Sequence, residues 1–377
     1  MKQDRFDFSL ADSIATEVEP VEPEKFDIHR YQDYEAALQE KNKAFWQSDT
    51  GILVYRRFRA PNIFSHACRD MKLSLALQLG ALNESIKYKA DIANYLEPWY
   101  GVGTVASAFG AKYHWAPGQA PATSPMFRTL DECLNSKITP IEQTDIGKHT
   151  LDMMEYFIDK TKGTVPISTT DTQSPFNTAS LLIDTNNFFM SIIDNPEGVK
   201  QLLSIIADLL IDFTNKQIEL LGDCRVKPGH AFASSRQFTG LGFSEDCVTM
   251  LSNEQYVNIA LPFIEKAGQS FRGVAFHSCG DWSRKIPSVK KINNLLMVDG
   301  AFSNRTDPCP NPCEPFSENF TDSNIVLHVR IVGDNEILLG KVKKLWRRPM
   351  KLIVATHSET PDLQSRAYNG IHEIAQS

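Results

Sequence analysis

His277 and Cys279 are the two residues of this sequence whose types and spacing best suit chemistry. They close the apolar run 273–278, which predicts a β-strand. Residues two apart on a strand point to the same face, so an imidazole and a thiol would point together. Nitrogen and sulfur donors on one face suit zinc. A packed strand end with a hydrogen-bonded histidine is the alternative, because two ligands do not make a site.

A zinc site needs at least a third protein ligand. His357 directly follows the apolar run 352–356, and closure of a barrel would bring it near His277. Cys309 and Cys313 are alternatives, in a proline-rich segment with no second cysteine pair at zinc-finger spacing. We therefore expect His357 as the third ligand and treat the two cysteines as ordinary loop residues.

Three aspartates occupy positions where catalytic acids are expected. Asp171 follows the β-prone run 165–170, and Asp299 follows the run 295–298. The ends of parallel strands are where functional groups of α/β proteins gather. Asp246 precedes a capped helix and would act as a general base, as a metal ligand or simply as a surface-turn acid.

Arginines and aromatic residues supply candidate substrate contacts. Arg56, Arg57 and Arg59 alternate with aromatic residues, and arginine binds carboxylates and phosphates bidentately. The same alternation fits a solvated strand face, which we favour. Trp99 and Tyr100 lie in a glycine-flanked loop that would line a flat aromatic ligand, although core packing explains them equally well.

The elements that would position these residues alternate along the chain. Asn195 caps a helix that Gly222 ends, and Ser252 begins a second helix that Gly268 ends. The β-prone runs separated by helical segments are 165–170, 273–278, 295–298, 325–332 and 352–356. This order predicts parallel strands in an α/β fold. A G-x-G-x-x-G motif follows none of these runs, which favours a barrel over an open dinucleotide-binding sheet.

Composition limits the class of protein. The 377 residues are 42% hydrophobic and carry a net charge of −7, which argues against nucleic acid or an anionic membrane as the main partner. An acidic N-terminus without an apolar core is not a signal peptide, and no apolar stretch reaches membrane-spanning length. Seven scattered cysteines indicate reduced thiols, so we expect a cytoplasmic protein. Residues 1–27, interrupted by Pro20 and Pro23, predict an extended arm.

Several motifs together resemble one family. Phe276-His-Ser-Cys-Gly-Asp281 resembles the H-x-C-G motif of the uroporphyrinogen decarboxylase superfamily, which includes zinc methyltransferases that take methyl groups from corrinoid proteins. Further similar segments, in the family's order, are 171–176, 194–198, 242–246, 252–256 and 261–263, with aspartates at 299 and 334. The resemblance runs from about residue 90 to the end, whereas 28–90 matches poorly. It implies a (β/α)8 TIM barrel over residues 28–377, with the arm 1–27 as an N-terminal extension.

The resemblance favours the methyltransferase branch. Classical decarboxylases carry an R-Q-A-G-R segment that the sequence 56–59 does not match. The methyltransferases bind zinc through the two residues that match His277 and Cys279 and through a C-terminal cysteine, which His357 would replace here. The implied reaction is attack of a zinc-activated substrate thiolate on the methyl group of a corrinoid, with a corrinoid protein as a possible partner. Asp171, Asp246 and Asp299 would position groups or handle protons.

Two alternatives remain open at this point. One is metal-free decarboxylation of a tetrapyrrole, with Arg56, Arg57 and Arg59 holding its carboxylates and an aspartate facing the pyrrole N–H groups. The other is a barrel that binds a tetrapyrrole or corrinoid without turnover. Incubation with uroporphyrinogen and metal analysis separate these functions.

Overall fold

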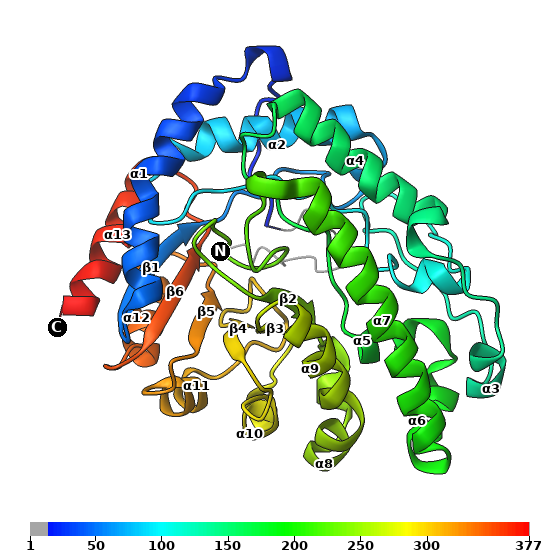
Figure 1. The fold of residues 1–377 in the computed structure, drawn as a ribbon. Coiled ribbons are helices and arrows are strands. Elements are labelled where there is room, and N and C mark those ends of the chain that lie inside the picture. The colour runs from blue at the N-terminus through cyan, green and yellow to red at the C-terminus, as the bar shows by residue number, and fades with distance from the viewer. Residues whose placement is uncertain (1–13, 377) are drawn as a thin grey trace.

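The computed structural model describes residues 14–376, and a parallel β-sheet forms its centre (Figure 1). Six strands pair in the order β1-β6-β5-β4-β3-β2. All five pairings are parallel. The strands are β1 Gly51–Arg56, β2 Leu241–Ser244, β3 Val274–His277, β4 Leu295–Ala301, β5 Val326–Arg330 and β6 Lys351–Thr356.

Two irregular segments, around Leu96 and Ile167, lie between β2 and β1, and a third around Arg225 pairs with the second. Ile167 forms parallel bridges to Leu96 on one side and to Arg225 on the other. Farther along the same segment, Gln173 bridges to Ser244 of β2. Pro166 has no N–H to donate, which explains why this stretch does not form a regular ladder. With the first two segments the six strands make the eight strand positions of a barrel.

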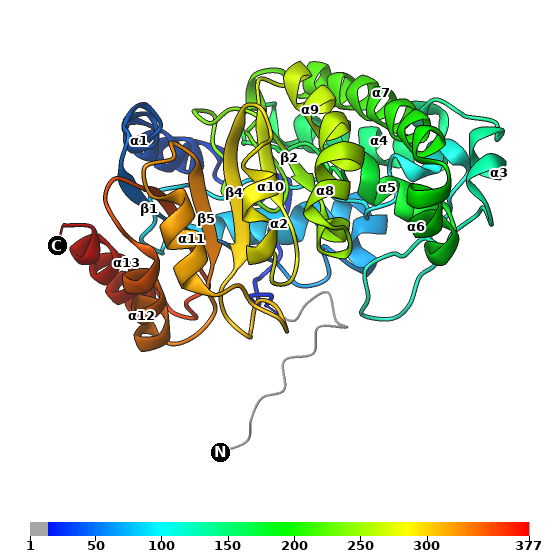
Figure 2. The same cartoon turned by 90° about the horizontal axis from the view of Figure 1, so that it is seen from below.

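Helices cover the outside of the strands (Figures 1 and 2). The chain enters through α1 and leaves through α13, which lie on the same side of the barrel as β1 in Figure 1. The helices are α1 Ile28–Gln47, α2 Met71–Ser85, α3 Leu130–Leu134, α4 Asp145–Thr161, α5 Pro175–Leu182, α6 Thr185–Asp194, α7 Pro196–Leu221, α8 Asn253–Gln255, α9 Leu261–Ser270, α10 Ile286–Val289, α11 Cys313–Phe320, α12 Asn335–Leu345 and α13 Pro361–Gln376. No helix within residues 14–376 is both long and apolar enough to cross a membrane.

Most elements expected from the sequence are present. The runs 273–278, 295–298, 325–332 and 352–356 contain β3, β4, β5 and β6, and the helix expected after Asn195 is α7. The helix expected from Ser252 is interrupted by a π-helical turn, Tyr256–Ala260, between α8 and α9. The run 165–170 is no regular strand, since only Ile167 pairs.

The N-terminal arm and the arginine strand differ from expectation in part. Residues 1–13 of the predicted arm lie outside the described residues, and Pro23–Lys25 forms a short 3-10 helix. The solvated strand face favoured for the arginine cluster is wrong, because Arg56 and Arg57 are buried. In a closed barrel both faces of β1 are covered, one by the interior and one by helices.

Asp91 joins β1 to the two terminal helices. Its carboxylate accepts hydrogen bonds from the Val54 amide at 2.7 Å, from Lys41 of α1 at 2.5 Å and from Tyr368 of α13 at 2.7 Å. His372 of α13 lies 2.9 Å from the same group. Burial works to raise the pKa of Asp91, but the hydrogen bonds of His372 and Lys41 outweigh it and hold the pKa below its usual range. The carboxylate is therefore charged and fastens α13 to the barrel.

We predict that Asp91→Asn destabilises the protein by about 2 kcal/mol, because a buried acceptor for charged donors is lost. Hydrogen exchange should quicken in α13 more than in α7, which Asp91 does not contact. Urea unfolding and hydrogen-exchange mass spectrometry measure the two effects. Asp33→Asn, an exposed substitution in α1, is the matched control. Equal stability of the two variants would contradict the role of Asp91.

Candidate active site

A buried carboxylate, Asp299 of β4, organises one side of the barrel interior. Asp299 is the register partner of His277 on β3 and of His328 on β5. The Nδ1 atoms of His277 and His328 donate to its two oxygens at 2.6 and 2.7 Å. The Nε of Arg330 donates to the same carboxylate at 3.0 Å. Because neighbouring residues of parallel strands share a face, one acid receives three donors from the two strands beside it.

The protonation states follow from these contacts. Burial opposes the charge of Asp299, but Arg330 and His277 outweigh it and hold the pKa of this carboxyl well below its usual range. Burial likewise works to lower the pKa of His277, but the hydrogen bond and the charge of Asp299 raise it well above its usual value. Burial lowers the pKa of His328, which is therefore neutral. Asp299 is a charged acceptor, so both histidines present Nδ1–H to it.

The other nitrogen of His277 faces a cysteine and a second acid. Its Nε2 lies 3.6 Å from Sγ of Cys279 and 3.8 Å from Oδ1 of Asp246. Ligand atoms of the three residues all lie within 4.8 Å of one another. The backbone N–H of Cys279 donates to Asp246 at 2.7 Å, which ties the turn after β3 to the turn after β2. His277 is buried, whereas the Asp246 side chain is 39% exposed, so the group opens outward.

This donor set fits a zinc ion. Tetrahedral zinc with bonds of ~2.0 Å to nitrogen and ~2.3 Å to sulfur separates the two donor atoms by roughly 3.5 Å, close to the distance between His277 and Cys279. Zinc-binding histidines usually donate their second nitrogen to a carboxylate, as His277 does to Asp299. Three protein ligands leave a fourth position for a substrate.

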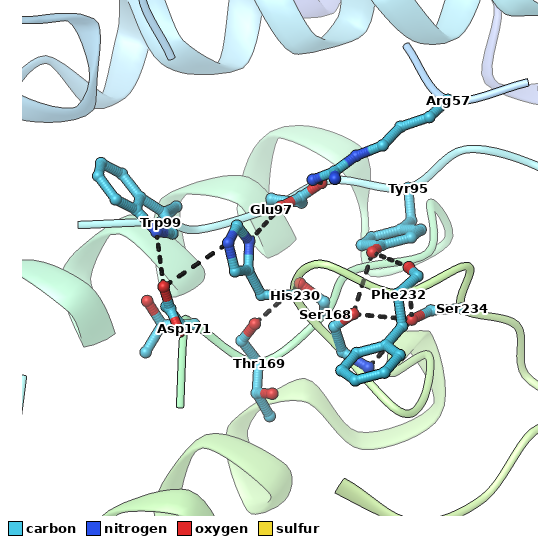
Figure 3. Close-up of polar contacts among 12 residues, drawn as sticks. Arg57, Tyr95, Glu97, Trp99, Ser168, Thr169, Asp171, His230, Phe232 and Ser234 are labelled. Atoms are coloured by element: carbon cyan, nitrogen blue, oxygen red, sulfur yellow. Dashed lines mark hydrogen bonds and ion pairs between the residues drawn. The ribbon is translucent and has the colours of Figure 1, made fainter. Parts of the chain in front are cut away.

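A second polar network lies around His230, as Figure 3 shows. Its Nδ1 lies 2.5 Å from Glu97, and its Nε2 lies 3.6 Å from Asp171. Arg57 contacts the other oxygen of Glu97 at 3.5 Å, and the indole N–H of Trp99 donates to Asp171 at 3.3 Å. A histidine held between two carboxylates can keep or pass a proton. This network is the second candidate for proton handling in the barrel.

Burial and charge set the ionisation of Glu97. Burial alone would raise the pKa of this carboxyl, but His230 and Arg57 outweigh burial and lower the pKa to about 2. Glu97 is therefore charged and matches the buried charge of Arg57. The network is held together by charge and is not a set of neutral hydrogen bonds.

Phe232 connects the two networks. Its ring centroid lies 6.5 Å from that of His277 and 6.1 Å from that of His328. Its backbone carbonyl accepts a hydrogen bond from Tyr95 at 2.6 Å, and Tyr95 also donates to Gly229, next to His230. The segment carrying His230 and Phe232 therefore packs inside the barrel and supports both groups.

Comparison with known proteins gives a family match and a structural likeness. Residues 47–226 match the family model of uroporphyrinogen decarboxylase (URO-D). A solved methyltransferase from Methanosarcina mazei is similar in structure, with a TM-score of 0.65 over 90% of this chain and 99% of that chain. The region that the family model matches is just under half of the chain, and over it the chain resembles the uroporphyrinogen decarboxylase family. The sequence identity to that methyltransferase is 13%, so that likeness supports the fold alone. A search of curated protein sequences gave no match.

The structural likeness confirms the TIM barrel expected from the sequence. The matched region differs from the one that the motifs indicate. It includes residues 47–90, where the sequence shows little resemblance, and it ends before His277 and Cys279. The family match therefore does not include His277 or Cys279, and the case for a metal site at these residues rests on their geometry.

His357 does not join the metal-binding group, and Asp246 takes its place among the residues described. β6, which His357 follows, is separated from β3 by β4 and β5, a span of roughly 14 Å along the sheet. Both ring nitrogens of His357 are buried and unpartnered within residues 14–376. Burial and the charges of Arg56 and Arg57 hold its pKa well below the usual value, so His357 is neutral. Cys309 and Cys313 also lie outside the group.

The expected substrate contacts separate into two sets. Arg57 and Trp99 belong to the His230 network. The guanidinium group of Arg56 instead forms hydrogen bonds with other parts of the protein. Arg56 donates to the backbone carbonyls of Ser358 and Arg57 and to the side chain of Thr16. Arg59 stacks on Phe64 with 4.1 Å to the ring centroid, and Tyr100 stacks on His149 with centroids 3.8 Å apart.

Sequence reasoning missed Glu97, His230, His328 and Arg330. His328 and Arg330 alternate on β5, and that spacing predicts a shared face. The sequence predicts Cys279 on the same strand as His277, but β3 ends at His277 and Cys279 lies in the turn after it. His230 and Glu97 are 133 positions apart, and only the fold brings them together.

We predict that Asp299→Asn destabilises the protein by about 3 kcal/mol, because Arg330 and His277 lose the charge that pairs with them inside the barrel. Chemical denaturation at pH 7 measures the loss. Asp152→Asn, on the exposed side of α4, controls for removing one negative charge. A loss no larger than that of the control would contradict the central role of Asp299.

Glu97→Gln should cost about 3 kcal/mol of stability at pH 7, because Arg57 then lacks a buried counter-charge. The pKa of Glu97 is lowered to about 2, so its contribution is complete above its unfolded pKa of about 4.3 and is lost as pH falls toward 2. The stability difference from wild type should therefore be constant from pH 7 to about 5 and shrink below about 4. Urea unfolding against pH, with the exposed Glu155→Gln as control, tests this. A difference that stays constant down to pH 3 would count against the charged network.

Proposed function

We propose that this chain is a zinc-dependent methyltransferase that moves a methyl group from a methylated corrinoid to the thiol of a small substrate. The observation that carries the proposal is the group Asp246, His277 and Cys279, whose ligand atoms lie within 4.8 Å of one another. The zinc would be held by His277 and Cys279, as expected from the sequence, with Asp246 in place of His357. The proposed reaction class is also the one in the name of the structural relative, whose likeness itself shows the fold.

The protein prepares the ligands before any ion binds. Asp299 holds His277 through Nδ1, which leaves Nε2 as the nitrogen that faces the site. The amide of Cys279 holds Asp246 beside the thiol, so the turns after β2 and β3 keep their spacing. A zinc ion bound there would make a substrate thiol available as a thiolate at neutral pH.

The net reaction balances without an external oxidant or reductant. The thiolate sulfur forms a bond to the methyl carbon, and the cobalt–carbon bond breaks with its electron pair left on cobalt. A methylcobalt(III) corrinoid thus becomes a cobalt(I) corrinoid, and the thiol becomes a thioether with loss of its proton. Asp171 and His230 would position the substrate or accept that proton, and Trp99 would fix Asp171 through its indole N–H. A corrinoid-carrying protein is the expected partner.

The arginines disfavour the decarboxylase alternative. Carboxylate binding would need free guanidinium groups, whereas Arg56 bonds to three protein groups and Arg57 pairs with Glu97. Metal-free decarboxylation of a tetrapyrrole therefore ranks second. Incubation with uroporphyrinogen under anaerobic conditions tests it directly.

We predict about one zinc per chain in the purified protein, measured by elemental analysis after dialysis against metal-free buffer. His277→Ala and Cys279→Ala should lose the zinc, and Asp246→Asn should weaken zinc binding about tenfold or more, because one ligand charge is removed. His357→Gln and Cys309→Ser should keep it, since both residues lie outside the group. Stoichiometric zinc in the His277 and Cys279 variants would remove the assignment.

Activity is tested in the same set of proteins. With methylcobalamin as donor and a small alkyl thiol as acceptor, wild type and the two control variants should form the thioether. The variants that lose zinc should not. Thioether formation by zinc-free wild type, or decarboxylation of uroporphyrinogen by any of these proteins, would contradict the proposal.

A further inference from the structure

A cavity of about 270 Å³ lies at the N-terminal ends of β2 and β3, whereas the candidate active site lies at their C-terminal ends. Asn215 lines it from the C-terminal half of α7, and Leu241, the first residue of β2, lines it from the barrel. Arg272 lines it two residues before β3 begins. The metal-binding group follows the opposite, C-terminal ends of β2 and β3, so the cavity is a separate place in the fold.

The charges around this cavity are of one sign. Arg225, Lys227 and Arg272 line it, and no aspartate or glutamate does. Within residues 14–376 the three side chains form no ion pair, and Nε of Arg225 is buried without a hydrogen-bond partner. Burial lowers the pKa of Lys227, and the charges of Arg225 and Arg272 lower it further. Burial and Arg272 lower the pKa of Arg225 in the same way.

Uncompensated like charges of this kind are costly to bring together. Arg225 and Lys227 are partly buried and Arg272 is exposed, so two of the three charges lose part of their hydration without gaining a counter-charge. An anion bound in this cavity would bring a counter-charge to the cations that line it and would accept a hydrogen bond from Nε of Arg225. Arginine offers a planar pair of donors to an oxyanion, and lysine adds a point charge, a combination typical of phosphate sites.

We propose that the cavity lined by Arg225, Lys227 and Arg272 binds the phosphate group of a small molecule. The volume is roughly nine times the ~30 Å³ that one water occupies in the liquid, which leaves room for a phosphate with a short carbon chain. Asn215 would contribute an amide to the same ligand. The site is independent of the proposed methyl transfer, since it shares no residue with the metal-binding group.

Isothermal titration calorimetry on the full chain tests the proposal, with inorganic phosphate and glycerol 3-phosphate as separate probes. Sodium chloride keeps the ionic strength constant, because surface charges bind anions weakly and are screened by salt. Saturable binding of either probe is expected. Lys227→Gln and Arg272→Gln should each weaken binding about tenfold, the loss of one charge-assisted hydrogen bond. Tighter binding of glycerol 3-phosphate would assign the site to phosphomonoesters, and tighter binding of inorganic phosphate to the free ion.

Matched controls separate this cavity from general surface charge. Lys148→Gln and Arg30→Gln remove exposed cations elsewhere and should leave phosphate binding unchanged. Arg272 is itself exposed, so Arg272→Gln should fold even if the Lys227 variant does not. His277→Ala should bind phosphate as wild type does. Absence of saturable binding, or equal affinity in the cavity variants and the controls, would overturn the proposal.

Discussion

The interior of this barrel depends on one buried charge, the carboxylate of Asp299. It accepts from His277 of β3 and from His328 and Arg330 of β5, so a single group spans three adjacent strands. A carboxylate inside a protein is tolerated only with such partners, because its desolvation would otherwise be prohibitive. The same contacts fix the orientation of the His277 ring and thereby the atom that it turns toward Cys279. The same charged contacts therefore stabilise the barrel and orient His277, the proposed metal ligand.

A second set of charges occupies the barrel wall between β1 and β2, where the strands are irregular. Glu97, His230 and Asp171 lie in segments with little regular strand pairing. Contacts between their charged side chains hold these segments together where ladder hydrogen bonds are few. The ring of Phe232 packs against His277 and His328, and Phe232 lies two residues after His230 of this network. The interior therefore holds two charged groups side by side that share a nonpolar boundary. Such a division suits a reaction in which ligand binding and proton handling belong to different residues.

The candidate active site and the basic cavity lie at opposite ends of β2 and β3. The turns after these strands carry Asp246 and Cys279, whereas Leu241 and Arg272 lie where the strands begin. TIM barrels place chemistry at the C-terminal ends of strands and leave the other end to stability. An uncompensated cluster of three cations is an unusual way to stabilise that end, because it adds repulsion. Its presence is explained most simply by a ligand of opposite charge.

The sequence by itself indicated parallel strands in an α/β fold, the strands that carry His277 and Asp299, and the paired imidazole and thiol, while the barrel was implied by the resemblance of its motifs to a known family. Hydrophobic periodicity, helix caps and a two-residue spacing are local properties, and local properties can be read along the chain. Only the tertiary structure decided that Asp246 lies beside His277, that His357 does not, and that Arg56 and Arg57 are buried. It also brought Glu97 to His230. These outcomes depend on which strands are neighbours and how the loops between them turn, and no spacing in the sequence encodes a distance between segments that meet only when the barrel closes.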